Sequence, residues 1–242
     1  MKATRFEFRF RFLIHGLLYL VSFVMPWNKW LHLDTVRTWQ WLASLLSRAG
    51  VLGFSSATLL VLVVGICFAL AAALLRTWGS AYLGHGVVHD SAMHGDRVVA
   101  AGPYRYMRNP LYLGTFLHTC SLALLTMPSG ALFMLVTIGL LQVRLIGAEE
   151  SFLTQQLGDA YREYCMRVPR LVPALRPRTE ASGVRPEWGW ATLSEIYIWG
   201  VAISYGALGW MYNAVLILQG VLVSLGVSMV VRSLLQRPKK TA

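Results

Sequence analysis

One stretch of the sequence constrains the fold more than any other. Residues 51–75 contain no charged side chain and consist largely of Ala, Val, Leu, Ile and Gly. As a helix this run would extend about 38 Å, and about 20 apolar residues are enough to cross a hydrocarbon core about 30 Å thick. The sequence therefore predicts a membrane-spanning helix here, and the rest of the chain has to fold around it.

Similar apolar runs recur from one end of the chain to the other. Hydrophobic residues make up 56% of the sequence and charged residues only 14%, whereas soluble domains carry about 25% charged residues. The further runs cover residues 13–27, 111–127, 131–146, 190–209 and 213–235. We predict an all-α, polytopic membrane bundle of about six transmembrane helices. Pro128-Ser129-Gly130 would be a tight turn between the third and fourth helices.

The basic residues are distributed as a membrane topology would place them. Of the 22 Lys and Arg residues, all but Lys29, Arg37 and Arg48 lie in four segments, and an even number of spans puts these segments on one side. The positive-inside rule then places both termini in the cytoplasm, in a bacterial inner membrane or an ER-type membrane. The net charge of +11 is thereby explained by topology, and we expect no nucleic-acid partner.

The chain divides into three parts. Residues 1–76 hold N-terminal membrane helices and an interfacial loop, residues 77–175 a core with a loop, a helical hairpin and a cytosolic helix, and residues 176–242 a basic linker and a C-terminal transmembrane hairpin. The three cysteines are scattered, which indicates no disulfide framework. His85 and His89 are four residues apart, but glycines beside them disfavour a helix, and we expect no metal site.

The most distinctive motif is Gly-Pro-Tyr-Arg-Tyr-Met-Arg-Asn-Pro-Leu-Tyr-Leu-Gly at residues 102–114. Pro103 and Pro110 punctuate it, so a short turn-rich connector should lead into a helix that begins at Pro110. Arginines and tyrosines at such a boundary could simply be an interfacial aromatic belt. Alternatively, the tyrosine rings can stack on a base or face a sulfonium cation, and the arginines can hold a carboxylate.

An acidic pair, Glu149-Glu150, directly follows the fourth apolar run. Carboxylates at a low-dielectric boundary are costly unless they are paired or functional. We expect the pair to open a separate amphipathic helix that ends near Met166, where the helix dipole would favour acidic residues. The topology places this pair on the same face as the 102–114 motif. A carboxylate there could accept hydrogen bonds from a ribose diol or hold an ammonium group. These are the needs of S-adenosylmethionine, and since no glycine-rich loop follows a strand, a Rossmann-type methyltransferase is excluded.

Together, the 102–114 motif, Glu-Glu-x-x-Leu, Leu-Gly-x-x-Tyr-x-x-Tyr and Arg-Val-Pro-Arg-Leu-x-Pro resemble the isoprenylcysteine carboxyl methyltransferases and the related phospholipid methyltransferases. The resemblance covers about residues 81–173. It implies an integral membrane enzyme that binds S-adenosyl-L-methionine in a cytosolic pocket formed by the C-terminal half. Its lipophilic acceptor would enter sideways from the bilayer.

Carried over by position, the resemblance assigns cofactor contacts to His89, Asp96, Arg97, Val98, Val99, Tyr104, Asn109, Pro110, Leu111, Tyr112 and Glu149. Arg108 or Arg144 would position a carboxylate acceptor, and Glu150 or a histidine could serve as a base for an amine acceptor. Two departures concern the acceptor: Asn109 stands where histidine is common, and Leu145 occupies the acceptor-side arginine position, with Arg144 beside it.

The resemblance favours carboxyl O-methylation of an isoprenoid- or lipid-linked carboxylate. Three alternatives stay open: N-methylation of a phospholipid or amine, an NADPH-dependent membrane reductase of the sterol reductase type, and a non-catalytic membrane protein. The last two spans would line the acceptor groove or form a homodimer contact.

Overall fold

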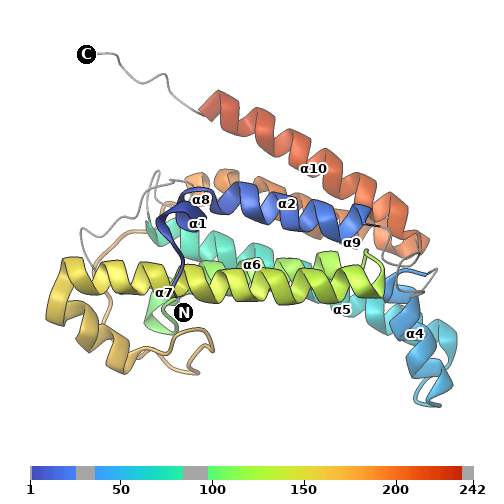
Figure 1. Ribbon diagram of the computed structural model, residues 1–242, viewed down its shortest axis with the longest axis horizontal. Helices are drawn as coiled ribbons and strands as arrows, with labels where there is room; N and C mark the ends of the chain where they lie inside the picture. Colours follow the sequence, from blue (N-terminus) through green and yellow to red (C-terminus); the bar gives the residue numbers. More distant parts are fainter. Residues whose placement is uncertain (1, 26–35, 84–97, 236–242) are drawn as a thin grey trace.

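The computed structural model describes residues 2–25, 36–83 and 98–235, and within these ranges the chain forms helices and irregular connections but no strand. Figure 1 shows most helices running along the long axis of an elongated bundle, with the chain beyond Gly158 turned back beneath one end. The predicted all-α class is confirmed.

Three helices of the described chain are long and apolar enough to cross a membrane: α5 (Phe54–Leu83), α7 (Pro128–Arg167) and α10 (Ala214–Leu235). The other predicted spans coincide with shorter helices, α2 (Arg11–Val24), α6 (Pro110–Ala123) and α9 (Ile196–Leu208). The chain is thus a helical membrane protein, and the count of six spans remains a prediction.

The phenylalanine-rich N-terminus is helical. Thr4 caps α1 (Arg5–Arg9) by accepting a hydrogen bond from the Glu7 amide, and the Glu7 carboxylate accepts one from the Thr4 amide. This reciprocal capping box satisfies two amides that would otherwise be unpaired. Phe8 is buried against Leu141 and Leu145 of α7, so α1 anchors the start of α2 to the middle of the bundle.

The turn between α6 and α7 lies earlier than predicted. The chain turns over residues 124–127, and Pro128-Ser129-Gly130 is the first turn of α7. Proline suits this position because the first helical residue has no intrahelical hydrogen bond to donate. Gly130 is required for packing, since a Cβ there would collide with the carbonyl oxygen of Ser22 on α2.

The prediction that Glu149-Glu150 opens a separate helix is wrong. α7 continues without a break from Pro128 past the acidic pair, and the helical backbone is interrupted only at Gly158, with φ 56° and ψ −129°. The change from apolar to polar residues alters the surroundings of the helix but not its backbone hydrogen bonds, and Ala, Glu, Gln and Leu favour helix. The glutamates are therefore held on a rigid helix, and the dipole explanation for them fails.

The apolar run that predicted the second span stops at residue 75, but α5 continues and Arg76 lies well inside it. α5 runs on to Leu83, and Arg76 forms a two-fold ion pair with Glu195, at 2.7 and 2.9 Å. Glu195, only 1% exposed, marks the junction between α8 (Trp188–Ser194) and α9.

α5 is the centre of the bundle and packs against α4 (Thr38–Arg48), α6 and α9. α10 packs on α9 and then diverges from α2 toward its C-terminal end (Figure 1).

Candidate functional site

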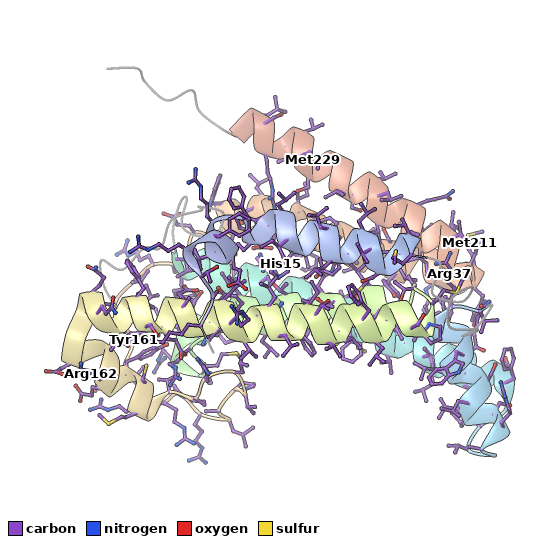
Figure 2. The ribbon with its side chains drawn as sticks, viewed as in Figure 1. His15, Arg37, Tyr161, Arg162, Met211 and Met229 are labelled. Atoms are coloured by element: carbon purple, nitrogen blue, oxygen red, sulfur yellow. The ribbon has the colours of Figure 1, made fainter. Side chains whose placement is uncertain are left out.

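A cavity of about 790 Å³ lies inside the bundle and is the centre of the candidate site. Figure 2 labels three of its wall residues: His15 on α2, Tyr161 on α7 beyond the Gly158 kink, and Met229 on α10. The wall therefore combines helices from the start, middle and end of the chain. Its volume lies in the range of small-molecule sites, about 300–1,000 Å³.

The cavity is polar at one end and apolar at the other. The term "polar end" is used below for the part of the cavity that is lined by Val98, Val99, Tyr104, Arg108, Asn109, Pro110, Leu111, Tyr112, Glu149, Tyr161 and Tyr164. The term "apolar end" is used for the part that is lined by Gly16, Leu20, Phe23, Val24, Leu122, Leu218 and Leu222. Pro110 and Leu122 of α6 lie about 18 Å apart along the helix axis. A cavity of this shape suits an amphiphile.

Nine of the residues predicted from the sequence come together at the polar end. They are Val98, Val99, Tyr104, Arg108, Asn109, Pro110, Leu111, Tyr112 and Glu149. His89, Asp96 and Arg97 lie outside the described residues. The structure does not bring Arg144 or Glu150 to the cavity wall.

Glu149 lines the cavity, and its carboxylate accepts one side-chain hydrogen bond. The Tyr112 hydroxyl donates to Glu149 Oε2 at 2.9 Å. Among the described residues Glu149 has no ion-pair partner. Burying a carboxylate in such a site is energetically costly unless a ligand supplies positive charge or further hydrogen-bond donors.

Tyr104 presents a second unsatisfied group to the same space. It sits in the 3₁₀ turn η1 (Gly102–Arg105), and its carbonyl oxygen accepts a hydrogen bond from the Tyr164 hydroxyl at 2.8 Å. Its own hydroxyl is buried and has no partner among the described residues. Burial, and then the negative charge of Glu149, hold the pKa of Tyr104 well above its usual value. The phenol therefore stays neutral and can donate to or accept from a ligand.

The turn that carries Tyr104 depends on one glycine. Gly102 has φ +53°, and a Cβ there would overlap the ring of Tyr82 at the end of α5. Only glycine accepts both this conformation and this approach without strain. The glycine that begins the 102–114 motif thus fixes where Tyr104 lies.

Glu150 is the hub of a polar network behind the cavity wall. It accepts hydrogen bonds from Arg108 Nε and Asn109 Nδ2, both at 3.0 Å, and pairs with Arg170 at 2.9 Å. Arg108 also donates to the carbonyl oxygens of Cys165 and Val168, at 2.7 and 2.9 Å. The network ties the end of α7 to the 102–114 motif. Within it, the amide of Asn109 acts as a hydrogen-bond donor to Glu150.

Arg144 is occupied elsewhere. Its guanidinium binds the two oxygens of Glu7 at 3.0 and 2.8 Å, and its carbonyl oxygen accepts from the Ala3 amide. The hydrogen bond from Arg144, followed by the one from the Thr4 amide, lowers the pKa of Glu7 to about 2. In the structure Arg144 therefore fastens α1 to α7.

Several polar wall residues were not predicted from the sequence. Arg76 and Glu195 pair on the wall, with Ser80 and Thr115 bound to them at 2.7 Å. His118 is 2% exposed, and neither ring nitrogen has a partner among the described residues. The available signal was a polar residue inside an apolar run, which in a membrane protein often marks a ligand pathway.

Comparison with known proteins finds one family that the chain is similar to. Residues 53–160 match the family model described as phospholipid methyltransferase. This segment is similar to a phospholipid methyltransferase domain. The resemblance to the superfamily of isoprenylcysteine carboxyl and phospholipid methyltransferases is thereby confirmed. Neither the curated proteins nor the solved structures gave a significant match.

The domain accounts for only part of the cavity. Residues 53–160 cover α5, η1, α6 and most of α7, and they include Tyr104, Tyr112 and Glu149. The α2 and α10 walls, which form most of the apolar end, lie outside the matched segment.

Proposed function

We propose that this protein is an S-adenosylmethionine-dependent membrane methyltransferase whose acceptor is a lipophilic molecule with a carboxylate, linked to an isoprenoid or another lipid. The observation that carries the proposal is the juxtaposition of the unpaired Glu149 carboxylate and the unpartnered Tyr104 hydroxyl at one end of a cavity that is apolar at the other. A methyltransferase domain supplies both groups.

The polar end fits S-adenosylmethionine by the chemistry of its side chains. Glu149 can accept hydrogen bonds from a ribose diol or hold an ammonium group, and Tyr104 can donate or accept beside it. Tyr112 holds the Glu149 carboxylate at 2.9 Å and presents an aromatic ring to the same space. When bound, the cofactor would supply an electrophilic methyl group on a sulfonium. His89, Asp96 and Arg97 remain further predicted contacts.

The apolar end fits the tail of the acceptor. α2 and α10 line it, and we expect a lipid tail to enter there from the bilayer. An ionised carboxylate is already nucleophilic and needs no base. The protein has to align it with the methyl group and exclude water, and a largely apolar cavity favours both. Of the two arginines predicted to orient it, Arg108 lies on the wall and Arg144 does not.

N-methylation of a phospholipid amine is the second candidate. It is favoured by the description of the matching family and by Glu149, because an unpaired carboxylate can hold an ammonium group. An ammonium must lose a proton before methyl transfer. Glu149 is better placed for this than Glu150, which is bound by Arg108, Asn109 and Arg170. We further propose that both termini and the polar end face the cytoplasm, following the distribution of basic residues.

Isotope labelling of native membranes tests this function and identifies the acceptor. Membranes containing the protein are incubated with S-adenosylmethionine carrying a labelled methyl group, and lipids and proteins are analysed by mass spectrometry. We expect one class of lipophilic molecule to gain the label as a methyl ester. A labelled amine would select the second candidate, and no protein-dependent label would refute both. An NADPH-binding measurement on the same preparation checks the reductase alternative.

A further inference from the structure

Charged side chains are concentrated on the cavity wall. The described wall carries four arginines and two glutamates: Arg11, Arg76, Arg108, Arg232, Glu149 and Glu195. Arg76 pairs with Glu195, and Arg108 pairs with Glu150 behind the wall. Arginines outnumber glutamates on the described wall, and charge complementarity favours an anionic ligand there.

Arg232 has the least satisfied guanidinium of the wall. It lies in the last turn of α10, and its Nη2 donates a long hydrogen bond of 3.3 Å to the carbonyl oxygen of Ser194. Its Nε is buried and has no partner among the described residues. A buried donor without a partner is energetically costly, so a ligand that brings an acceptor to this Nε would be stabilised.

The neighbouring carboxylate does not meet this need. Glu195 lies near enough to act electrostatically on Arg232, and so does Arg76. Both Glu195 oxygens, however, already accept hydrogen bonds from Arg76, and Oε1 also accepts one from Ser80. Among the described residues Arg232 forms no ion pair.

Arg232 also ends an apolar stripe on the helix that carries it. Leu218, Leu222, Leu225 and Met229 precede it on the cavity wall at intervals of three or four residues, which places all five side chains on one face of α10. Leu218 and Arg232 lie about 21 Å apart along the axis. One face of α10 thus offers a hydrocarbon surface followed by a guanidinium, the order of tail and head in an anionic amphiphile.

We propose that Arg232 binds the anionic group of the acceptor, a carboxylate or a phosphate, while the face of α10 before it holds the tail. Both anions match the planar guanidinium, which can bind two oxygens at once. The site rests on the proposed function for its place in catalysis, but its residues lie outside the matched methyltransferase domain. Acceptor choice is then a property of the C-terminal helix.

Three amphiphiles with the same hydrocarbon tail test the site: oleate, oleyl phosphate and oleyl alcohol. The affinity of each for the purified protein in detergent is taken from the concentration dependence of its thermal stabilisation. At least one of the two anions should stabilise the wild type, and the alcohol should not. Arg232→Gln should weaken that binding about 10- to 100-fold, the expected loss for hydrogen bonds to a charged group. Whichever of oleate and oleyl phosphate binds with the higher affinity shows whether the site prefers a carboxylate or a phosphate.

Arg162→Gln is the matched control, since Arg162 lies on an exposed part of α7 and pairs with Asp159 on the surface. It should bind as the wild type does. If Arg232→Gln does not fold, Arg232→Lys decides, because it keeps the charge but loses the planar fork and should bind about 10-fold more weakly. Equal stabilisation by the alcohol, or full anion affinity in the Arg232 variants, overturns the proposal. Separate calorimetry with S-adenosylmethionine distinguishes this failure from failure of the proposed function.

Discussion

Replacing Glu149 with glutamine should selectively weaken cofactor binding. Glutamine has nearly the same shape and can still accept the hydrogen bond from Tyr112, which in the wild type is 2.9 Å long. What is lost is the negative charge, which forms no ion pair with a described residue. A hydrogen bond to a charged group contributes about 1.5–3 kcal/mol, so the affinity for S-adenosylmethionine should fall about 10- to 150-fold.

Isothermal titration calorimetry of the purified protein in detergent measures this loss. Glu163→Gln is the control, because Glu163 lies on the same helix but is about 59% exposed and pairs only with Arg167. Exposed ion pairs contribute about 0–1 kcal/mol, so this variant should bind the cofactor normally. Tyr112→Phe should be intermediate, with a loss of about five-fold, because it removes the hydrogen bond that orients the Glu149 carboxylate but keeps the negative charge. Wild-type affinity in Glu149→Gln would refute the cofactor assignment.

Three further predictions concern the walls and the stability of the bundle. Gly16→Phe should reduce turnover of long-tailed acceptors about 10-fold without affecting cofactor affinity, because a Cβ at Gly16 meets no described atom within 4 Å and the ring would fill the apolar end. Gly206→Phe, at an open position that does not line the cavity, is its control in the same kinetic assay. Glu195→Ala should destabilise the protein by about 3–5 kcal/mol by leaving a buried arginine unpaired, and an unchanged thermal midpoint would contradict the pairing. Glu7→Gln should lower the thermal midpoint at pH 7, and the difference from wild type should disappear as the pH falls from about 4.5 to about 2, because the folded-state pKa of Glu7 is depressed and its contribution is lost on protonation. A difference that persists unchanged at pH 2 would show that the carboxylate charge is not the cause.

Local sequence features predicted the polar end well. Pro110 begins α6, the Gly102 turn precedes it, and the motif lies beside Glu149 as the charge distribution required. These features depend on proline and glycine stereochemistry and on membrane topology, which act over short range or on the whole chain. Both can be recognised without knowing the tertiary contacts.

The remaining features depend on contacts between residues far apart in the sequence. Arg76 looked like the end of a span because its partner, Glu195, is 119 residues away. Glu149 looked like the start of a helix because hydropathy changes there while backbone hydrogen bonding continues. The role of Arg232 depends on how α10 packs, and α10 lies beyond the segment that resembles known methyltransferases. Sequence patterns carry little information about such pairings.

Transfer of a labelled methyl group to native lipids tests the central claim most directly. Wild-type protein and Glu149→Gln are compared in bilayer nanodiscs with membrane lipid extract and methyl-labelled S-adenosylmethionine, and the label in the organic phase is counted. The account predicts label with the wild type and a loss of at least about 10-fold with Glu149→Gln at limiting cofactor concentration. Absence of label with the wild type, or equal label with both proteins, would contradict it.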